Sequence, residues 1–109
     1  MEGAAAWMLL QQVPGISNRR YKILIDCFEE PQHVFHAPAP RLKASAGLSD
    51  GIIAALRRSR MNDRVRREID LLHAGGYHFL TLNDPRYPGR LRHIPDPPPF
   101  LYVLVTPWN

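Results

Sequence analysis

The sequence has only one cysteine, Cys27, among its 109 residues, which excludes an internal disulfide. We interpret Cys27, which precedes Phe28, as a small apolar packing residue, and a lone thiol fits a cytoplasmic setting. No apolar run approaches the roughly 20 residues that a membrane-spanning helix needs, and Met1 to Gln12 lacks a basic and apolar leader with a cleavage site. We therefore expect a cytoplasmic protein without a membrane partner.

The patterns that carry catalysis or metal binding are also missing. Neither a Gly-x-Ser-x-Gly turn, nor a phosphate-binding loop, nor a paired acid and base constellation occurs. His33 and His36 are three residues apart, but no carboxylate or cysteine joins them at the spacing of metal ligands, and the other histidines are scattered. We expect no enzymatic activity, no catalytic residue, no cofactor and no metal.

What the chain does have is positive charge, concentrated in its middle. The formal net charge is +4, and residues 41–68 carry eight basic and three acidic side chains. This density suits a polyanion such as nucleic acid. Two alternatives are an acidic partner protein and a solvated helix face on which arginines pair with nearby carboxylates. Seven of these eight basic residues form the basic cluster: Lys43, Arg57, Arg58, Arg60, Arg64, Arg66 and Arg67.

The N-terminal half shows two similar helix-turn-helix patterns. The first helix has an apolar face at helical spacing and stops at Pro14-Gly15, after which Ser17 can cap a second helix ending at Phe28. The order glycine, aliphatic residue, serine recurs at Gly47-Leu48-Ser49, before another apolar helical pattern. We interpret the two as a degenerate internal repeat.

The first of these turns is the stronger candidate for a phosphate contact. A glycine permits a tight turn, and the amides at the start of the next helix lie at the positive end of its dipole, which binds phosphate without reading bases. In the second turn, Ala46 replaces the proline and Asp50 places a negative charge beside the amides. Either turn could also serve only to reverse the chain. The predicted DNA-binding residues are Gly15, Ile16, Ser17, Asn18, Arg19, Arg20 and Lys22, together with Arg57 and Arg58 from the basic cluster.

The C-terminal half reads as helix, strand, short helix, strand. A helix begins at Asn62 or Asp63, and the β-rich runs Tyr77–Leu82 and Phe100–Val105 follow. The 17 residues between the runs are too many for a hairpin but enough for a crossover, so we expect parallel strands with a right-handed connection, the second strand being buried on both faces. This order is typical of the start of a Rossmann-type sheet.

These C-terminal residues carry a specific resemblance. Leu82–Val103 reads Leu-x-Asp-Pro-x-Tyr-Pro-x-x-Leu-Arg-x-Ile-x-Asp-Pro-Pro-Pro-x-Leu-Tyr-Val, which resembles the DNA-processing protein family DprA (Smf). The turn at Val13–Ile16 and the helix after it resemble that family's N-terminal domain. The fold that this implies is mainly α: a helix-hairpin-helix or SAM-like bundle over residues 1–60, followed over residues 61–109 by a truncated α/β, Rossmann-like β-α-β piece.

The resemblance also implies a function. Members of this family bind incoming single-stranded DNA and help to load a RecA-type recombinase in natural transformation and recombination, and this part would serve as an accessory DNA contact or docking module. The family's glycine, serine and arginine-rich phosphate-binding loop would follow Asn109, so much of the contact with DNA would lie downstream. An unpaired strand edge along Phe100–Val105 predicts self-association. The alternative is a SAM-type protein-interaction module that does not bind DNA.

Overall fold

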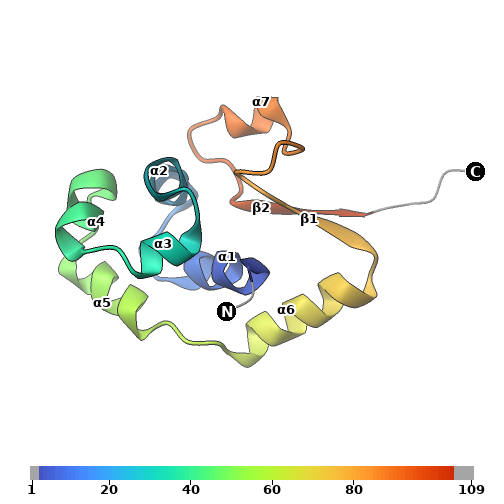
Figure 1. Cartoon of the computed structure of the whole chain (residues 1–109), viewed down its shortest axis with the longest axis horizontal. Helices are drawn as coiled ribbons and strands as arrows, with labels where there is room; N and C mark the ends of the chain where they lie inside the picture. Colours follow the sequence, from blue (N-terminus) through green and yellow to red (C-terminus); the bar gives the residue numbers. More distant parts are fainter. Residues whose placement is uncertain (1–2, 105–109) are drawn as a thin grey trace, which may run out of the picture.

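The computed structural model describes residues 3–104, and it is mainly helical, as the sequence predicts. Its helices precede and surround a small two-stranded sheet, as Figure 1 shows. No helix within the described residues is long and apolar enough to cross a membrane. The elements are α1 (Gly3–Gln12), α2 (Asn18–Phe28), α3 (Pro31–Phe35), α4 (Ala39–Ala46), α5 (Asp50–Arg58), α6 (Asp63–Ala74), β1 (Tyr77–Thr81), α7 (Gly89–Arg92) and β2 (Phe100–Leu104).

Helix α1 lies at the centre of the molecule, between α3 and α6 (Figure 1). Six consecutive residues from Ala5 to Leu10 are buried, so α1 has no solvent-facing stripe there. Trp7 and Leu10 join the core of α2 to α5, whereas Met8 and Leu9 pack with Val65 and Ile69 of α6. A helix that is apolar all round is one that neighbours cover on every side. The division at residue 60 stays a prediction.

The two turns of the proposed repeat have the same local geometry. Gly15 and Gly47 both have positive φ, at 91° and 65°. Ser17 accepts a hydrogen bond from the Arg20 amide, and Ser49 accepts one from the Ile52 amide, each at 3.2 Å. These serines therefore cap α2 and α5, as the sequence predicts. The pattern of glycine, aliphatic residue and serine thus gives a positive-φ glycine and a capping serine in both turns.

The two strands run antiparallel, so the predicted parallel β-α-β unit is wrong. Tyr77 lies opposite Leu104 and Thr81 opposite Phe100. The connection is a long hairpin loop rather than a right-handed crossover, and it contains the single short helix α7. The Rossmann-like piece expected from the order of elements is therefore absent from residues 3–104 in that form.

Hydrogen bonds within the connecting loop explain this topology. The Tyr87 hydroxyl donates to the Pro98 carbonyl at 2.7 Å, and the Leu82 amide donates to the Pro99 carbonyl at 3.1 Å. These bonds hold both ends of the loop at one end of the sheet. A hairpin loop of this length is tolerated because lengthening a loop adds little to the entropic cost of closing it. Helix α7 spans only about 6 Å. It is too short to return the chain along a strand of about 17 Å, as a parallel pairing requires.

The second strand is also more exposed than the sequence predicts. Phe100 and Leu101 are half-buried, but Tyr102, Val103 and Leu104 are 40, 40 and 55% exposed. The predicted burial on both faces is therefore wrong for this half of the strand. The reason is that the sheet of the described residues has only two strands, so α6 and the core cover only part of it. Val105, the last residue of the predicted strand, lies outside the described residues.

Candidate nucleic-acid interface

The turn from Gly15 to Arg20 presents the amide end of α2 to solvent. Ile16 is buried and anchors the turn, whereas Ser17, Asn18 and Arg19 are exposed. The capping hydroxyl of Ser17 accepts a hydrogen bond from the Arg20 amide. Within the described residues, the amides of Asn18 and Arg19 have no hydrogen-bond acceptor. They therefore lie at the positive end of an eleven-residue helix, available to an anion.

The three cations predicted to flank this turn have different surroundings. Arg20 donates through a guanidinium nitrogen to the Gly15 carbonyl at 2.9 Å, which closes the turn. Arg19 is exposed, and its side chain has no hydrogen bond or ion pair to any residue between 3 and 104. Lys22 lies further along α2 and lines a cleft of about 400 Å³ with Asp26 and Arg92. Only Arg19 and Arg20 therefore stand beside the turn.

Gly15 also fixes the position of the first turn against α5. A Cβ atom built on Gly15 would lie 2.6 Å from Cγ1 and 2.7 Å from Cδ1 of Ile52. A side chain at this position would force Ile52 to shift, and the φ of 91° disfavours any residue other than glycine. Ile52 lies at the start of α5, the helix that follows the Gly47 turn. The Gly15 turn therefore packs directly against α5.

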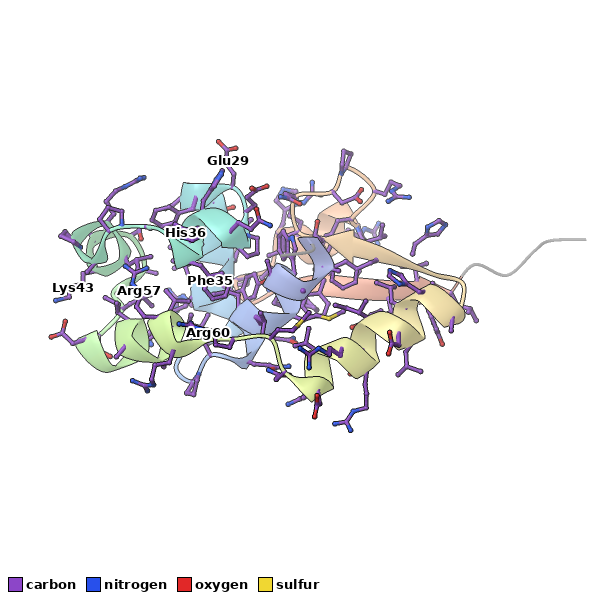
Figure 2. The ribbon with its side chains drawn as sticks, turned by 60° about the horizontal axis from the view of Figure 1, so that its bottom comes forward. Glu29, Phe35, His36, Lys43, Arg57 and Arg60 are labelled. Atoms are coloured by element: carbon purple, nitrogen blue, oxygen red, sulfur yellow. The ribbon has the colours of Figure 1, made fainter. Side chains whose placement is uncertain are left out.

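The two arginines predicted at the end of α5 do different things. The guanidinium of Arg57 donates to the Phe35 carbonyl at 2.6 Å and to the Ala37 carbonyl at 2.5 Å. Figure 2 shows Arg57 between α5 and α3, beside Phe35. It thus satisfies the carbonyl of the last residue of α3, where helices leave acceptors unpaired, and that of Ala37 in the segment that follows. Arg58 is exposed, and its side chain pairs with no residue in the described range.

Much of the wider basic cluster is likewise engaged within the protein. Arg60 donates to the carbonyls of Arg57 and Ser59, and Arg66 pairs with Asp63 at 3.3 Å. This agrees in part with the alternative of a solvated helix face. Among the described residues, Arg58, Arg64 and Arg67 are the members of the cluster whose side chains have no such partner. The free cations are therefore fewer than the sequence suggests.

The second turn carries an ion pair in place of free charge. Lys43 of α4 contacts the Asp50 carboxylate at 2.6 Å. The hydrogen bond from Lys43, together with its charge, lowers the pKa of Asp50 below its ordinary value. Asp50 is in the first turn of α5, so the second turn has a negative charge at the positive end of its helix dipole. The weaker DNA-binding role of the second turn stays a prediction.

The sequence analysis did not identify Arg92, a cation that lines a cleft. Arg92 donates to the Asp84 carbonyl at 2.6 Å and stacks over the Tyr87 ring, with 5.6 Å from Cζ to the ring centroid. Its Nε atom is buried without an acceptor, and the residue lines the same cleft as Lys22. The sequence signal that could have identified Arg92 was its position in the proline-rich motif, directly after Leu91. No group of three potential metal ligands occurs among residues 3–104.

The structure thus defines a helical protein with a repeated glycine-turn motif, joined to a β-hairpin. The chain is 31% identical to Protein Smf of Synechocystis sp. over 100 residues, which is 92% of this chain and 25% of that protein. This match confirms the resemblance to the DprA/Smf family, and it covers nearly the whole chain while spanning about a quarter of its relative's length. No family model matches, and no solved structure matches.

Proposed function

We propose that this chain is the N-terminal part of a DprA-like DNA-processing protein, and that it contacts DNA through the phosphate backbone at the start of α2. The observation that carries the proposal is the solvent-facing amide end of α2, flanked by the unpaired Arg19. The sequence relationship to Protein Smf supports a role in DNA processing. The helix-hairpin-helix or SAM-like character of residues 1–60 is part of this proposal.

The contact would be independent of base sequence. Backbone amides and arginine recognise phosphate oxygens, which are the same at every nucleotide. Arg19 would supply the charge and the amides of Asn18 and Arg19 the hydrogen bonds, while Arg20 and Gly15 keep the turn in shape. Arg58 would extend the positive surface, and Arg57 would act by holding α3 to α5.

In the longer protein, we propose that this module assists the handling of single-stranded DNA and its transfer to a RecA-type recombinase, as the family resemblance implies. The module would act as an accessory contact, with further binding groups in the remainder of the protein. We propose no catalytic step for it. Its cytoplasmic location remains part of the same hypothesis.

The test is the salt dependence of binding to a labelled single-stranded oligonucleotide, followed by fluorescence anisotropy. Arg19→Glu should weaken binding equally for oligonucleotides of different sequence. It should also make the slope of log affinity against log salt shallower by about 0.7–1, since one phosphate contact is lost. Arg19 is chosen over Arg20 because replacing Arg20 would also break its bond to the Gly15 carbonyl.

Arg90→Glu is the matched control. Arg90 is an exposed arginine on α7, and its side chain pairs with no residue in the described part of the chain. The same change of net charge there should alter binding much less. Equal loss in the two variants would show attraction by net charge alone, and unchanged affinity of Arg19→Glu at low salt would exclude the phosphate contact. Absence of binding by the unmodified chain would favour the protein-interaction alternative.

A further inference from the structure

A cleft of about 360 Å³ lies where α3 and α5 end and the segment that leads to α6 begins. We call it the α3–α5 cleft. Its wall combines cationic, aromatic and apolar side chains, and Figure 2 shows four of them close together: Phe35, His36, Arg57 and Arg60. Met61 is a further apolar member. The volume is at the lower end of the range for ligand sites, about 300–1,000 Å³, so the cleft suits one small group.

The charge of this cleft is of one sign. No acidic side chain lines it within residues 3–104. The cleft beside Lys22 differs, because Asp26 and Glu29 line it as well. Carboxylates in a wall repel an anion, whereas Arg57 and Arg60 face the α3–α5 cleft without a carboxylate beside them. This cleft therefore attracts negative charge.

Neutral carbonyls hold Arg57 and Arg60 in place without cancelling their charge. Arg57 donates to the carbonyls of Phe35 and Ala37. Arg60 donates to those of Arg57 and Ser59, at 2.9 and 2.8 Å. A guanidinium has five N–H donors, so each arginine keeps three that have no acceptor in the described part of the chain. An anion would thus meet two pre-positioned groups, which lose little conformational freedom on binding.

The helix ends beside the cleft do not outweigh this charge. The C-terminal end of a helix carries about half a negative charge, which comes from its unpaired carbonyls. Because α3 and α5 both end at the cleft, they bring at most about one negative charge between them. Arg57 and Arg60 each bring a full positive charge. The balance therefore stays positive.

The rest of the wall suits a flat ring. Phe35 is half-buried and Met61 is 37% exposed, so both present apolar surface to the cleft. His36 is exposed and adds a second aromatic ring. Nucleobases stack on aromatic side chains whichever base is present, and basic groups beside such rings hold the phosphates of the same strand. A methionine sulfur also packs well against a ring.

We propose that the α3–α5 cleft binds one nucleotide unit of single-stranded DNA, with the phosphate against Arg57 and Arg60 and the base against Phe35 and Met61. A base inside a duplex is stacked and paired, so it cannot enter such a cleft unless it is flipped out. The inference rests on the proposed DNA-binding function and adds a site that distinguishes single strands from duplexes. The proposed contact at the start of α2 would recognise phosphate alone.

The first experiment compares, by fluorescence anisotropy, the binding of the whole chain to three probes of equal length: an oligothymidine strand, an abasic strand with the same phosphates, and a duplex. The chain should bind the oligothymidine strand about fivefold more tightly than the abasic strand, or better, which corresponds to one stacked base. The duplex should bind no better than the abasic strand. Equal affinity for the oligothymidine and abasic strands, or for the oligothymidine strand and the duplex, would show that the inference is wrong.

Two variants test the cleft itself. His36→Glu places a carboxylate beside the arginines and should remove the preference for a strand with bases. Arg60→Gln should reduce this preference, and it should make the slope of log affinity against log salt shallower by about 0.7, because one phosphate contact is lost. It also serves if His36→Glu fails to fold, as judged by circular dichroism. A folded His36→Glu variant that keeps the full preference would contradict the proposal.

His93→Glu is the matched control. His93 and His36 are both exposed histidines that directly follow a short helix, and the substitution changes the net charge equally. His93→Glu should keep the preference, and its loss to the same extent as in His36→Glu would overturn the assignment to the cleft. Arg19→Glu should weaken binding to both single strands equally and leave the preference intact. A failure of that last variant counts against the contact at α2, whereas a missing preference counts against the cleft.

The methyl group of Met61 reports directly on the position of the base. Its NMR signal should move when the oligothymidine strand is added, because the ring current of a stacked base acts on it. The signal of Met8, which is buried at 2% exposure, should stay in place. An unmoved Met61 signal would exclude the proposed base position. A phosphoserine peptide that moves the Met61 signal as strongly as the oligonucleotide would show that the cleft takes a phosphoprotein instead.

Discussion

The two glycine turns share a positive-φ glycine and a serine cap but differ in electrostatics. Both combine a glycine of positive φ, a buried aliphatic residue and a capping serine. The first turn leads to Arg19, whose side chain has no partner within residues 3–104, whereas the second leads to Asp50, which pairs with Lys43. The comparison teaches that the same three residue types can recur at two turns while the residues just after them carry opposite charges.

The packing of the two turns differs as well. The first glycine lies against Ile52, but a Cβ atom on Gly47 would meet nothing within 4 Å. Gly15 thus contacts the second half of the repeat, whereas Gly47 has open space beside it although its neighbours Ala46 and Leu48 are buried. A mutation at equivalent positions should therefore have unequal effects.

Alanine at the two glycines should produce the largest difference. Gly15→Ala incurs a backbone penalty of about 1–2 kcal/mol for a left-handed conformation, and about 1–3 kcal/mol more for the overlap with Ile52. Gly47→Ala incurs only the first of these. We expect the lower free energy of unfolding for Gly15→Ala in urea denaturation followed by circular dichroism. Equal losses would contradict the role assigned to the Ile52 contact.

The next effect concerns the arginines that end the second half of the repeat. Arg57→Ala removes two hydrogen bonds, to the carbonyls of Phe35 in α3 and of Ala37 just beyond it, and should lower the free energy of unfolding by about 1–2 kcal/mol. Arg58→Ala removes no such bond and should leave stability nearly unchanged. The same urea titrations test this pair. A stable Arg57→Ala variant would show that this cation does not hold α3 to α5.

The smallest effect is the titration of Asp50. Because Lys43 lowers its pKa, the folded state gains stability from the ionised carboxylate above the pKa of the unfolded chain, and loses it as the pH falls through the folded value. Lys43→Met should raise the pKa of Asp50 towards its ordinary value of 3.8. Carboxyl chemical shifts in an NMR pH titration measure this directly. An unshifted pKa would show that the ion pair does not persist in solution.

The local features of the fold could be predicted from the sequence, because local chemistry determines them. Ser17 and Ser49 cap their helices as predicted, Asn62 caps α6 as the first of the two candidates that the sequence offered, and the apolar spacing located the helices. The strand direction could not be predicted from chain length alone. It depends on bonds such as that from Tyr87 to Pro98, which a count of 17 intervening residues does not reveal.

The candidate site likewise has features that the sequence could predict and features that it could not. The turn at Gly15 and its cap follow from neighbouring residues, so the sequence located them. The structural use of Arg57 involves Phe35 and Ala37, which are 22 and 20 residues away, and no local pattern signals such a contact. Charge density alone therefore overstated the number of cations free to bind DNA.

The most direct test of this account is to follow the backbone amide signals by NMR while a short single-stranded oligonucleotide is added. The account predicts that the amides of Asn18 and Arg19 shift first and most strongly, and that those of Asp50 and Gly51 shift little. Shifts of equal size at both turns, or larger shifts at the second, would contradict the claim that the charge beside each turn decides which one contacts the phosphate backbone.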